Sequence, residues 1–248
     1  MITIKTENEI KIMKEGGKIA ARILKIVARN VRPGIKTKFL DDIAKEEIKK
    51  EGVKASFFGH GGYPASICTS VNSEVVHGIP GEKILNEGDI VGIDLGIFHK
   101  GYHSDTAITV PVGKINFEKK ELIKITKKSL DDGIAIIKPG IFLGDVQHRI
   151  QSIIESAGFN VIRDLAGHGI GKNLQEMPSI PNYGRPKNGP ILKKGMVLAL
   201  EPMVVTGNWH VKILNDRWTV ATVDGSMSAH FEHTVAVRED GYEVLTRI

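Results

Sequence analysis

The chain has 248 residues, 41% of them hydrophobic and 25% charged, which is enough to bury a core in one domain or in two tightly joined halves. It has no apolar run near the roughly 18 residues of a membrane span and no secretory signal pattern. Its single cysteine, Cys68, excludes an internal disulfide, so we expect a cytoplasmic protein. The net charge of +5 is spread along helical stretches, which favours a solvated lysine and glutamate surface over specific nucleic-acid binding.

The predicted elements are helices and short strands in irregular order. A capping-box spacing at Thr6–Glu9 predicts a helix that runs to about Asn30, and Pro33–Gly34 breaks it. The pattern then predicts helices at about 38–50, 118–137 and 144–157, and strands at about 65–71, 90–98, 103–112, 161–165, 196–202, 218–223 and 230–238. Without regular βαβ alternation, this order favours an α+β fold over a doubly wound sheet.

A weak internal repeat relates two parts of the chain at an offset of 106 residues. The segment Arg32–Ile35 matches Lys138–Ile141, and the helical pattern after each segment stops at Gly52 and Gly158 respectively. Identities are few, but a duplicated α+β unit explains the repeat better than chance does. We therefore expect a single domain, residues 1–248, made of halves at about 1–112 and 113–248.

Two aspartates in neighbouring predicted strands indicate a metal site. The midpoint between Asp94 and Asp105 falls between His99 and Lys100, so a symmetric hairpin would place the two aspartates directly opposite each other, with Cβ atoms about 5 Å apart. Two carboxylates so close repel each other, and a divalent cation between them is the simplest compensation. The alternative is that both are turn or surface residues. That alternative is weaker for Asp94, because it ends an apolar run.

Three further residues have the same character. Glu201 closes the apolar run Met196–Leu200, and Glu232 stands in another β-rich run, where a charged side chain is rarely buried unless it is paired or bound to a metal. His168 has a glycine on each side. A lone histidine there can also be structural, and the loop lacks a phosphate-binding pattern. Two Asp, two Glu and one His suit Mn, Fe(II), Co or Zn, held as a pair about 3.5–4 Å apart by bridging carboxylates.

Taken together, the motifs resemble those of the methionine aminopeptidases. They are the segment Ser66–Pro80, Asp94 followed by Asp105 eleven residues on, Gly167–Gly171, Glu201–Pro202 and Phe231–Thr234, and the resemblance extends from about residue 4 to residue 245. It implies the pita-bread fold, in which two pseudo-symmetric α/β halves surround a curved antiparallel sheet. It also implies two divalent metal ions on Asp94, Asp105, His168, Glu201 and Glu232, with Asp105 and Glu232 bridging.

The length of the chain distinguishes subtypes within this resemblance. Only 33 positions separate His168 from Glu201, which leaves no room for the helical insertion of the type II enzymes, so the chain resembles type I. Prolidases and Xaa-Pro aminopeptidases share the fold but usually carry a large N-terminal domain, and we expect none here. A non-enzymatic binding protein on the same fold is the other alternative, and the retention of all five ligand residues argues against it.

The resemblance further implies the reaction. The enzyme would remove the initiator methionine from nascent proteins and peptides, with a preference for a small second residue, through attack by a hydroxide that bridges the two ions. His77 would hydrogen-bond the substrate near the scissile amide, and Glu201 would carry a proton to the leaving amine. Tyr63, Cys68, Leu174 and Trp218 would enclose the methionine side chain, although each could instead simply fill the core.

Two positions depart from the family pattern. Gln175 stands where a substrate-contacting histidine is usual, and its amide can donate a hydrogen bond but cannot carry a proton. Position 230 is histidine where glutamine is common, and nothing in the sequence explains that change. As partners we expect N-terminal methionine peptides and nascent chains, with transient ribosome contact, no membrane, no specific nucleic acid and a monomeric state.

Overall fold

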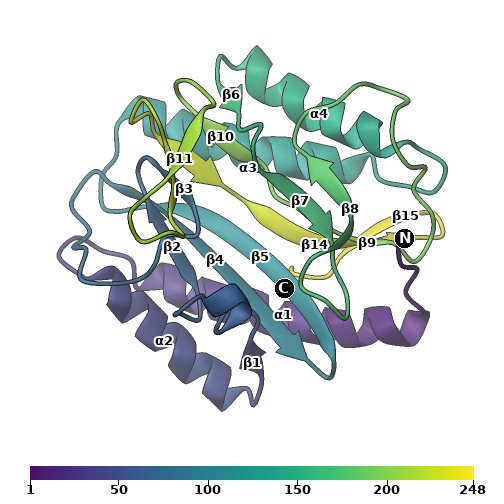
Figure 1. Ribbon diagram of the computed structural model, residues 1–248, viewed down its shortest axis with the longest axis horizontal. Coiled ribbons are helices and arrows are strands. Elements are labelled where there is room, and N and C mark those ends of the chain that lie inside the picture. The colour runs from purple at the N-terminus through teal and green to yellow at the C-terminus, as the bar shows by residue number, and fades with distance from the viewer.

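The computed structural model describes all residues, 1–248, as four long helices around one curled antiparallel sheet (Figure 1). Helices α1 (Glu7–Arg29) and α2 (Thr37–Lys50) cover one part of the sheet, and α3 (Phe117–Ala135) and α4 (Leu143–Ser156) cover the other. None of these helices combines the length and apolar character that crossing a membrane requires. The predicted helices are confirmed to within two residues at each end.

The helices begin and repeat as the sequence indicates. The side chains of Thr6 and Glu9 form the predicted capping box at the start of α1. Helices α2 and α4 are related by the same offset of 106 residues that relates the two sequence segments. Gly52 and Gly158, which follow them, both have a positive φ, 67° and 83°, a conformation that glycine adopts without strain.

The main sheet has nine strands in the order β1-β4-β5-β14-β9-β7-β8, with β2 paired to β4 and β15 to β14. Its strands are β1 (Lys54–Ala55), β2 (Cys68–Val71), β4 (Ile90–His99), β5 (Tyr102–Pro111), β7 (Ala166–Gly169), β8 (Glu176–Pro181), β9 (Val197–Leu200), β14 (Glu232–Arg238) and β15 (Gly241–Val244). Two three-stranded sheets, β13-β10-β6 and β11-β12-β3, complete the fold. They contain β3 (Glu74–Val76), β6 (Asn160–Val161), β10 (Met203–Val205), β11 (Val211–Ile213), β12 (Val220–Thr222) and β13 (Ser228–His230).

Several predicted strands are shorter than the sequence indicates. The prediction at 161–165 is wrong beyond Val161, and the strand predicted from residue 65 begins at Cys68. The run 230–238 is two strands, because the chain passes at Phe231 from β13, which pairs with β10, to β14, which pairs with β9. The segment that pairs with this run also changes sheets. It passes from β9 to β10 at Glu201–Pro202, where proline cannot donate a ladder hydrogen bond. Glu201 and Glu232 therefore both lie at the junction of two sheets.

The hairpin that carries the two aspartates differs from the prediction. Its turn consists of Lys100 and Gly101, with φ of 49° and 89°, and residues 99 and 102 pair on either side of it. Two successive positive φ values are typical of a type I′ hairpin turn. Asp94 is therefore opposite Ala107, and Asp105 is opposite Gly96. The prediction of directly opposed aspartates is wrong, because the turn lies one residue later than assumed. The two side chains still share one face as diagonal neighbours.

Two hydrophobic clusters hold the helices on the sheet. One joins α1 and α2 to β2, β4 and adjacent loops, and includes Ile23, Leu40 and Ile93, which are all essentially inaccessible. The other joins α3 and α4 to β9 and β14, and includes Leu122, Val146 and Leu198. Because the helices cover one face of the sheet, the other face is left to carry the polar side chains described next.

Candidate active site

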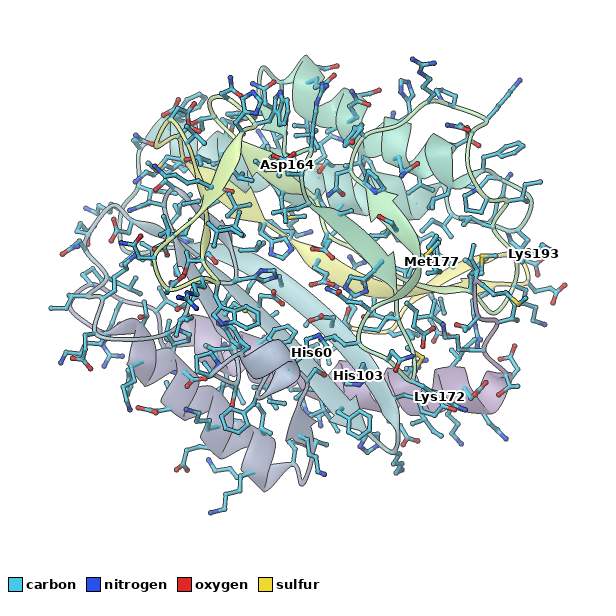
Figure 2. The ribbon with its side chains drawn as sticks, in the orientation of Figure 1. His60, His103, Asp164, Lys172, Met177 and Lys193 are labelled. Carbon is cyan, nitrogen blue, oxygen red and sulfur yellow. The ribbon has the colours of Figure 1, made fainter.

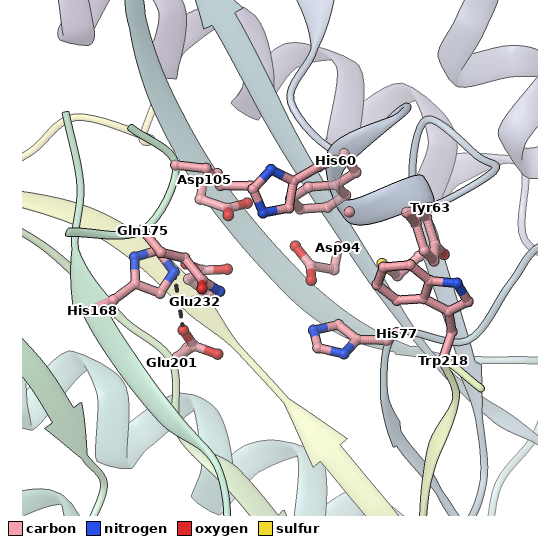
Figure 3. A pocket seen from close by; sticks show the side chains of 14 residues that line it. His60, Tyr63, His77, Asp94, Asp105, His168, Gln175, Glu201, Trp218 and Glu232 are labelled. Atoms are coloured by element: carbon pink, nitrogen blue, oxygen red, sulfur yellow. Dashed lines mark ion pairs between the residues drawn. The ribbon is translucent and has the colours of Figure 1, made fainter. Parts of the chain in front are cut away.

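A pocket of about 300 Å³ opens on the face of the sheet that the helices do not cover (Figure 3). Fourteen residues line it, and they include all eleven site residues that the sequence predicts. The three that sequence reasoning missed are Phe57, His60 and Gly61. Segments far apart in the chain, from residue 57 to residue 232, thus converge on one cavity.

The five predicted metal ligands come from five successive strands of the sheet. In the spatial order β4-β5-β14-β9-β7, they are Asp94, Asp105, Glu232, Glu201 directly after β9, and His168. This arrangement is a consequence of the antiparallel ladder, which places one acidic or imidazole side chain from each neighbour above the same region of the sheet. Ligand atoms of Asp105, His168 and Glu232 lie within 4.8 Å of one another.

The carboxylates of this cluster are not neutralised by any nearby cation of the protein. Burial raises the pKa of Asp105 to about 7, and burial together with neighbouring negative charges raises the pKa of Asp94 and of Glu232 well above the ordinary range. Burial, and then the charge of Asp105, also raises the pKa of Glu201 well above its usual value. Asp94 Oδ1 and Glu232 Oε1 are buried and have no hydrogen-bond partner. Unpaired buried oxygens and excess negative charge fit bound divalent cations.

His168 is prepared to act as a ligand through one defined nitrogen. Its Nδ1 lies 2.9 Å from the carbonyl oxygen of Gly169, so Nδ1 carries the proton and donates. Burial lowers the pKa of the imidazole, which keeps it neutral. The lone pair of Nε2 is therefore free, and it faces the cluster 3.6 Å from Glu201 Oε1 (Figure 3). A backbone acceptor that orients a histidine in this way is typical of metal sites.

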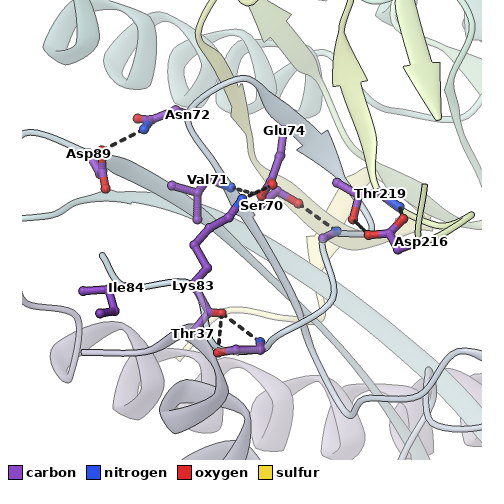
Figure 4. Close-up of polar contacts among 12 residues, drawn as sticks. Thr37, Ser70, Val71, Asn72, Glu74, Lys83, Ile84, Asp89, Asp216 and Thr219 are labelled. Atoms are coloured by element: carbon purple, nitrogen blue, oxygen red, sulfur yellow. Dashed lines mark hydrogen bonds and ion pairs between the residues drawn. The ribbon is translucent and has the colours of Figure 1, made fainter. Parts of the chain in front are cut away.

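His77 lies at the other end of the pocket on a tight turn. Its φ is 60°, and at the following Gly78 a Cβ atom would come within 2.2 Å of the carbonyl oxygen of Thr69. Polar contacts hold this segment: Glu74 accepts from the backbone N–H of Val71 at 2.7 Å and also pairs with Lys83 (Figure 4). Burial lowers the pKa of His77, so its neutral ring can donate a hydrogen bond into the pocket.

The predicted methionine-side-chain pocket is assembled around Tyr63. Its ring meets Trp218 edge to face, with ring centres 5.2 Å apart and planes at 79°, and its hydroxyl donates to Gly78 O at 3.0 Å. Cys68 is buried beside it, and burial raises the pKa of its thiol well above the ordinary value, so it remains protonated. Leu174 adds an aliphatic wall. These residues both pack and line the cavity, so the core-filling alternative does not exclude a pocket role.

His60 and Gln175 are the exposed polar residues of the pocket (Figure 3). His60 begins the short 3-10 turn His60–Gly62, and Figure 2 shows it beside His103 near the centre of the molecule. The glycines at 59, 61 and 62 all have positive φ. A histidine within a glycine cluster is the sequence signal that could have identified it. Gln175 precedes Glu176, which pairs with Lys5 at 2.8 Å and so anchors this segment to the N-terminal segment.

The histidine at position 230 lies behind the pocket wall. It is the last residue of β13 and is 3% exposed. Its Nε2 is buried without a hydrogen-bond partner and lies 3.8 Å from Glu201 Oε2. Burial, and to a lesser extent the neighbouring His77, lower the pKa of His230 to about 3, so the ring is neutral.

The fold and this cluster of acids define a class of metallopeptidase. The sequence pattern of metallopeptidase family M24 matches residues 11–239, and the chain belongs to that family. Methionine aminopeptidase 1 of Bacillus subtilis (strain 168) is 50% identical over 248 residues, which is 100% of both chains. The crystal structure of methionine aminopeptidase from Thermotoga maritima superposes with a TM-score of 0.99 at 49% identity and covers 100% of both chains. The prediction of a metal-dependent methionine aminopeptidase with the pita-bread fold is confirmed.

A more distant solved structure shares the fold at low sequence identity. The prolidase from Pyrococcus horikoshii OT3 superposes with a TM-score of 0.79 at 24% identity; the match covers 98% of this chain but 63% of that one. At this identity the likeness shows a shared fold and nothing about substrate. By contrast, the methionine aminopeptidases match along their whole length.

Proposed function

We propose that this chain removes the initiator methionine from nascent proteins and peptides whose second residue is small. The observation that carries the proposal is the coincidence, in one pocket, of the acidic cluster with an apolar compartment built from Tyr63, Cys68, Leu174 and Trp218. A thioether side chain fits such a compartment, and the peptide's free α-amine would lie at the metal cluster beside it. The preference for a small second residue is what the resemblance to the methionine aminopeptidases implies.

We infer that two divalent ions are held by Asp94, Asp105, His168, Glu201 and Glu232, with Asp105 and Glu232 shared between the ions. Their oxygen-rich set with one nitrogen suits Mn, Fe(II), Co or Zn. Divalent ions bound there supply Lewis-acid chemistry, which lowers the pKa of water and polarises a carbonyl group. The orphaned oxygens of Asp94 and Glu232 support two-ion occupancy, because one ion on Asp105, His168 and Glu232 would leave Asp94 uncompensated.

Each remaining polar side chain has a role in the proposed reaction. Neutral His77 donates a hydrogen bond to the substrate near the scissile amide, and its rigid turn fixes the direction of that bond. Glu201 would accept a proton and deliver it to the leaving amine. Gln175 offers its amide N–H to a substrate carbonyl from the opposite wall. His60, exposed at the same wall, contacts the residues after the methionine.

The direct test is methionine release from Met-Ala-Ser by protein loaded in turn with Mn, Co, Fe(II) and Zn. We expect metal-dependent release of free methionine and none from a blocked, N-acetylated peptide. Release from the blocked peptide, or release of a dipeptide, would contradict an aminopeptidase that recognises the free α-amine. Cleavage of Xaa-Pro dipeptides in preference to Met-Ala-Ser would assign the chain to the prolidase reaction instead.

Gln175→His is expected to raise kcat for Met-Ala-Ser by about 10-fold, because imidazole can transfer a proton as well as donate a hydrogen bond at this exposed wall. The measurement is steady-state kinetics of the Mn-loaded variant. Gln147→His on α4, outside the pocket, is the matched control and should leave kcat unchanged. An unchanged kcat in Gln175→His would mean that the amide already supplies everything this position contributes.

The substrate class suggests where the protein works. Nascent chains present their N-termini at the ribosome, so we propose a cytoplasmic monomer that contacts ribosomes transiently. The net charge of +5 supports attraction to an RNA surface, a contact that should weaken as salt concentration rises. Co-sedimentation with ribosomes at low and high salt would test this contact.

A further inference from the structure

His230 is a buried histidine, and no contact in the structure satisfies its Nε2 nitrogen. Its side chain is 4% exposed, and Nε2 has no hydrogen-bond partner. Such an unpaired buried group costs free energy and is rarely retained without a reason. The nearest acidic atom is Glu201 Oε2, at 3.8 Å.

Hydrogen bonds on both sides hold the main chain of His230 in place. The N–H of His230 donates to Thr109 Oγ1 at 2.8 Å, and the same hydroxyl donates to the carbonyl oxygen of His230 at 2.9 Å. Residue 230 also pairs with Met203 in the register of β10 and β13. The backbone at residue 230 is therefore held on both sides, and the side chain is 4% exposed, so burial leaves the ring little room to turn away from Glu201.

Glu201 lies between two imidazoles, and only one of them can donate to it. His168 Nε2 is 3.6 Å from Oε1, but the proton of that ring is on Nδ1, where Gly169 O accepts it at 2.9 Å. The Nε2 atom of His168 therefore presents a lone pair and no hydrogen. His230 has no competing acceptor at Nε2, so its neutral ring is free to carry the proton there.

We propose that His230 is a positioning residue for Glu201, to which it donates a hydrogen bond from Nε2–H to Oε2. Moving from 3.8 Å to a hydrogen-bond length of about 2.9 Å requires less than an ångström of side-chain adjustment. The bond stops the carboxyl group from rotating and directs Oε1 toward the cluster and the leaving amine. This inference rests on the proposed role of Glu201 as proton carrier.

The consequence falls on the chemical step rather than on substrate binding. Glu201 acts on the leaving amine, whereas the methionine side chain is held by Tyr63 and Trp218 at a separate wall. Loss of the positioning bond should therefore lower kcat and leave KM nearly unchanged. Glutamine in place of His230 keeps an N–H donor at similar reach, whereas leucine keeps the volume and loses the donor.

The kinetic test compares His230→Leu with His230→Gln in the Mn-loaded protein. We expect His230→Leu to lose about 10- to 100-fold in kcat with KM within about 3-fold, and His230→Gln to stay within about 5-fold of the native kcat. The matched control is His233→Leu, because His233 hydrogen-bonds Thr246 outside the pocket and should leave kcat unchanged. A native kcat in His230→Leu, or equal losses in both His230 variants, would overturn the proposal.

A second measurement does not depend on activity. Isothermal titration with Mn²⁺ should show about 10-fold weaker binding for His230→Leu than for the native protein. In a Glu201→Ala background, the same His230→Leu change should weaken Mn²⁺ binding no further, because its effect passes through Glu201. Equal weakening in both backgrounds would overturn the proposal. If the native protein released no methionine, the proposed function would fail, while the Mn²⁺ titrations would still decide whether His230 acts through Glu201.

Discussion

Asp105→Asn is expected to abolish methionine release and, at the same time, to stabilise the metal-free protein. The amide keeps the volume and can still accept from the backbone N–H of Thr106, a bond of 3.0 Å in the native protein. It removes the negative charge that would bridge two ions, so kcat/KM for Met-Ala-Ser should fall by at least about 10³-fold. It also removes a buried carboxylate whose pKa is raised to about 7, so the metal-free variant should melt at a higher temperature than the native protein at pH 8.

These two opposite effects separate a functional residue from a structural one. The measurements are Mn-dependent kinetics and thermal unfolding of chelator-treated protein at pH 8. Asp164→Asn is the control, since Asp164 is exposed and has no hydrogen bond or ion pair, and it should change neither quantity. If Asp105→Asn lowered the melting temperature as well as the activity, Asp105 would be a stabilising side chain and the proposed metal site would lose its main support.

The parts of the fold that the sequence predicts well are those with local causes. The capping box at Thr6–Glu9 and the glycines after α2 and α4 act within one or two turns, and the helices end where these residues predict. The repeat at offset 106 is likewise reproduced by α2 and α4. Helix periodicity and caps are physical constraints that a single sequence expresses directly.

The errors arise where pairing partners decide the structure. The hairpin register depends on which residues occupy the turn. The turn at Lys100 and Gly101 lies one residue later than assumed, which shifts the pairing by two residues, from Asp94 opposite Asp105 to Asp94 opposite Ala107. The break at Phe231 exists because β13 and β14 find different partners, β10 and β9. The alternation of residues within a strand reveals neither fact, because the register follows from the conformation of the turn and the break at Phe231 follows from pairing with strands distant in the sequence.

In the site, too, some features can be predicted from the sequence and others appear only in the structure. Placement in or after apolar or β-rich runs singles out Asp94, Glu201 and Glu232, and the resemblance to the methionine aminopeptidases implies the full set with Asp105 and His168. His60 was missed, although the glycines around it, at 59, 61 and 62, were a signal that could have identified it. The unpartnered Nε2 of His230 is visible only once β13 is placed beside Glu201. The sequence thus identifies charged residues that need a partner, whereas the structure identifies neighbours, such as His230, that can interact with them.

The metal-free protein should lose stability as pH rises from 6.5 to 8.5, and Mn²⁺ should abolish that loss. Carboxyl groups with raised pKa values bind protons more tightly when folded, so their stabilising contribution is present at low pH and is lost as pH rises toward the folded pKa. Asp105 loses its contribution up to about pH 7, and Asp94, Glu201 and Glu232, whose pKa values burial raises well above the ordinary range, lose theirs as pH rises through those raised values.

Buried histidines act in the opposite direction but over a lower pH range. Burial lowers the pKa of His103 and His233 to about 4 and that of His230 to about 3, so these rings destabilise the fold only as pH falls below about 6.5, where the unfolded histidines become protonated. Above pH 6.5 they contribute no pH dependence. The groups with raised pKa set the slope: the acidic cluster, joined near pH 8.5 by the buried Cys68 thiol. Thermal unfolding of chelator-treated protein should therefore show a falling melting temperature from pH 6.5 to 8.5.

Saturating Mn²⁺ should raise the melting temperature more at pH 8.5 than at pH 6.5, because binding requires the ionised carboxylates and relieves their repulsion. A metal-free melting temperature that is constant or rises across this range would show that the cluster is compensated without a metal.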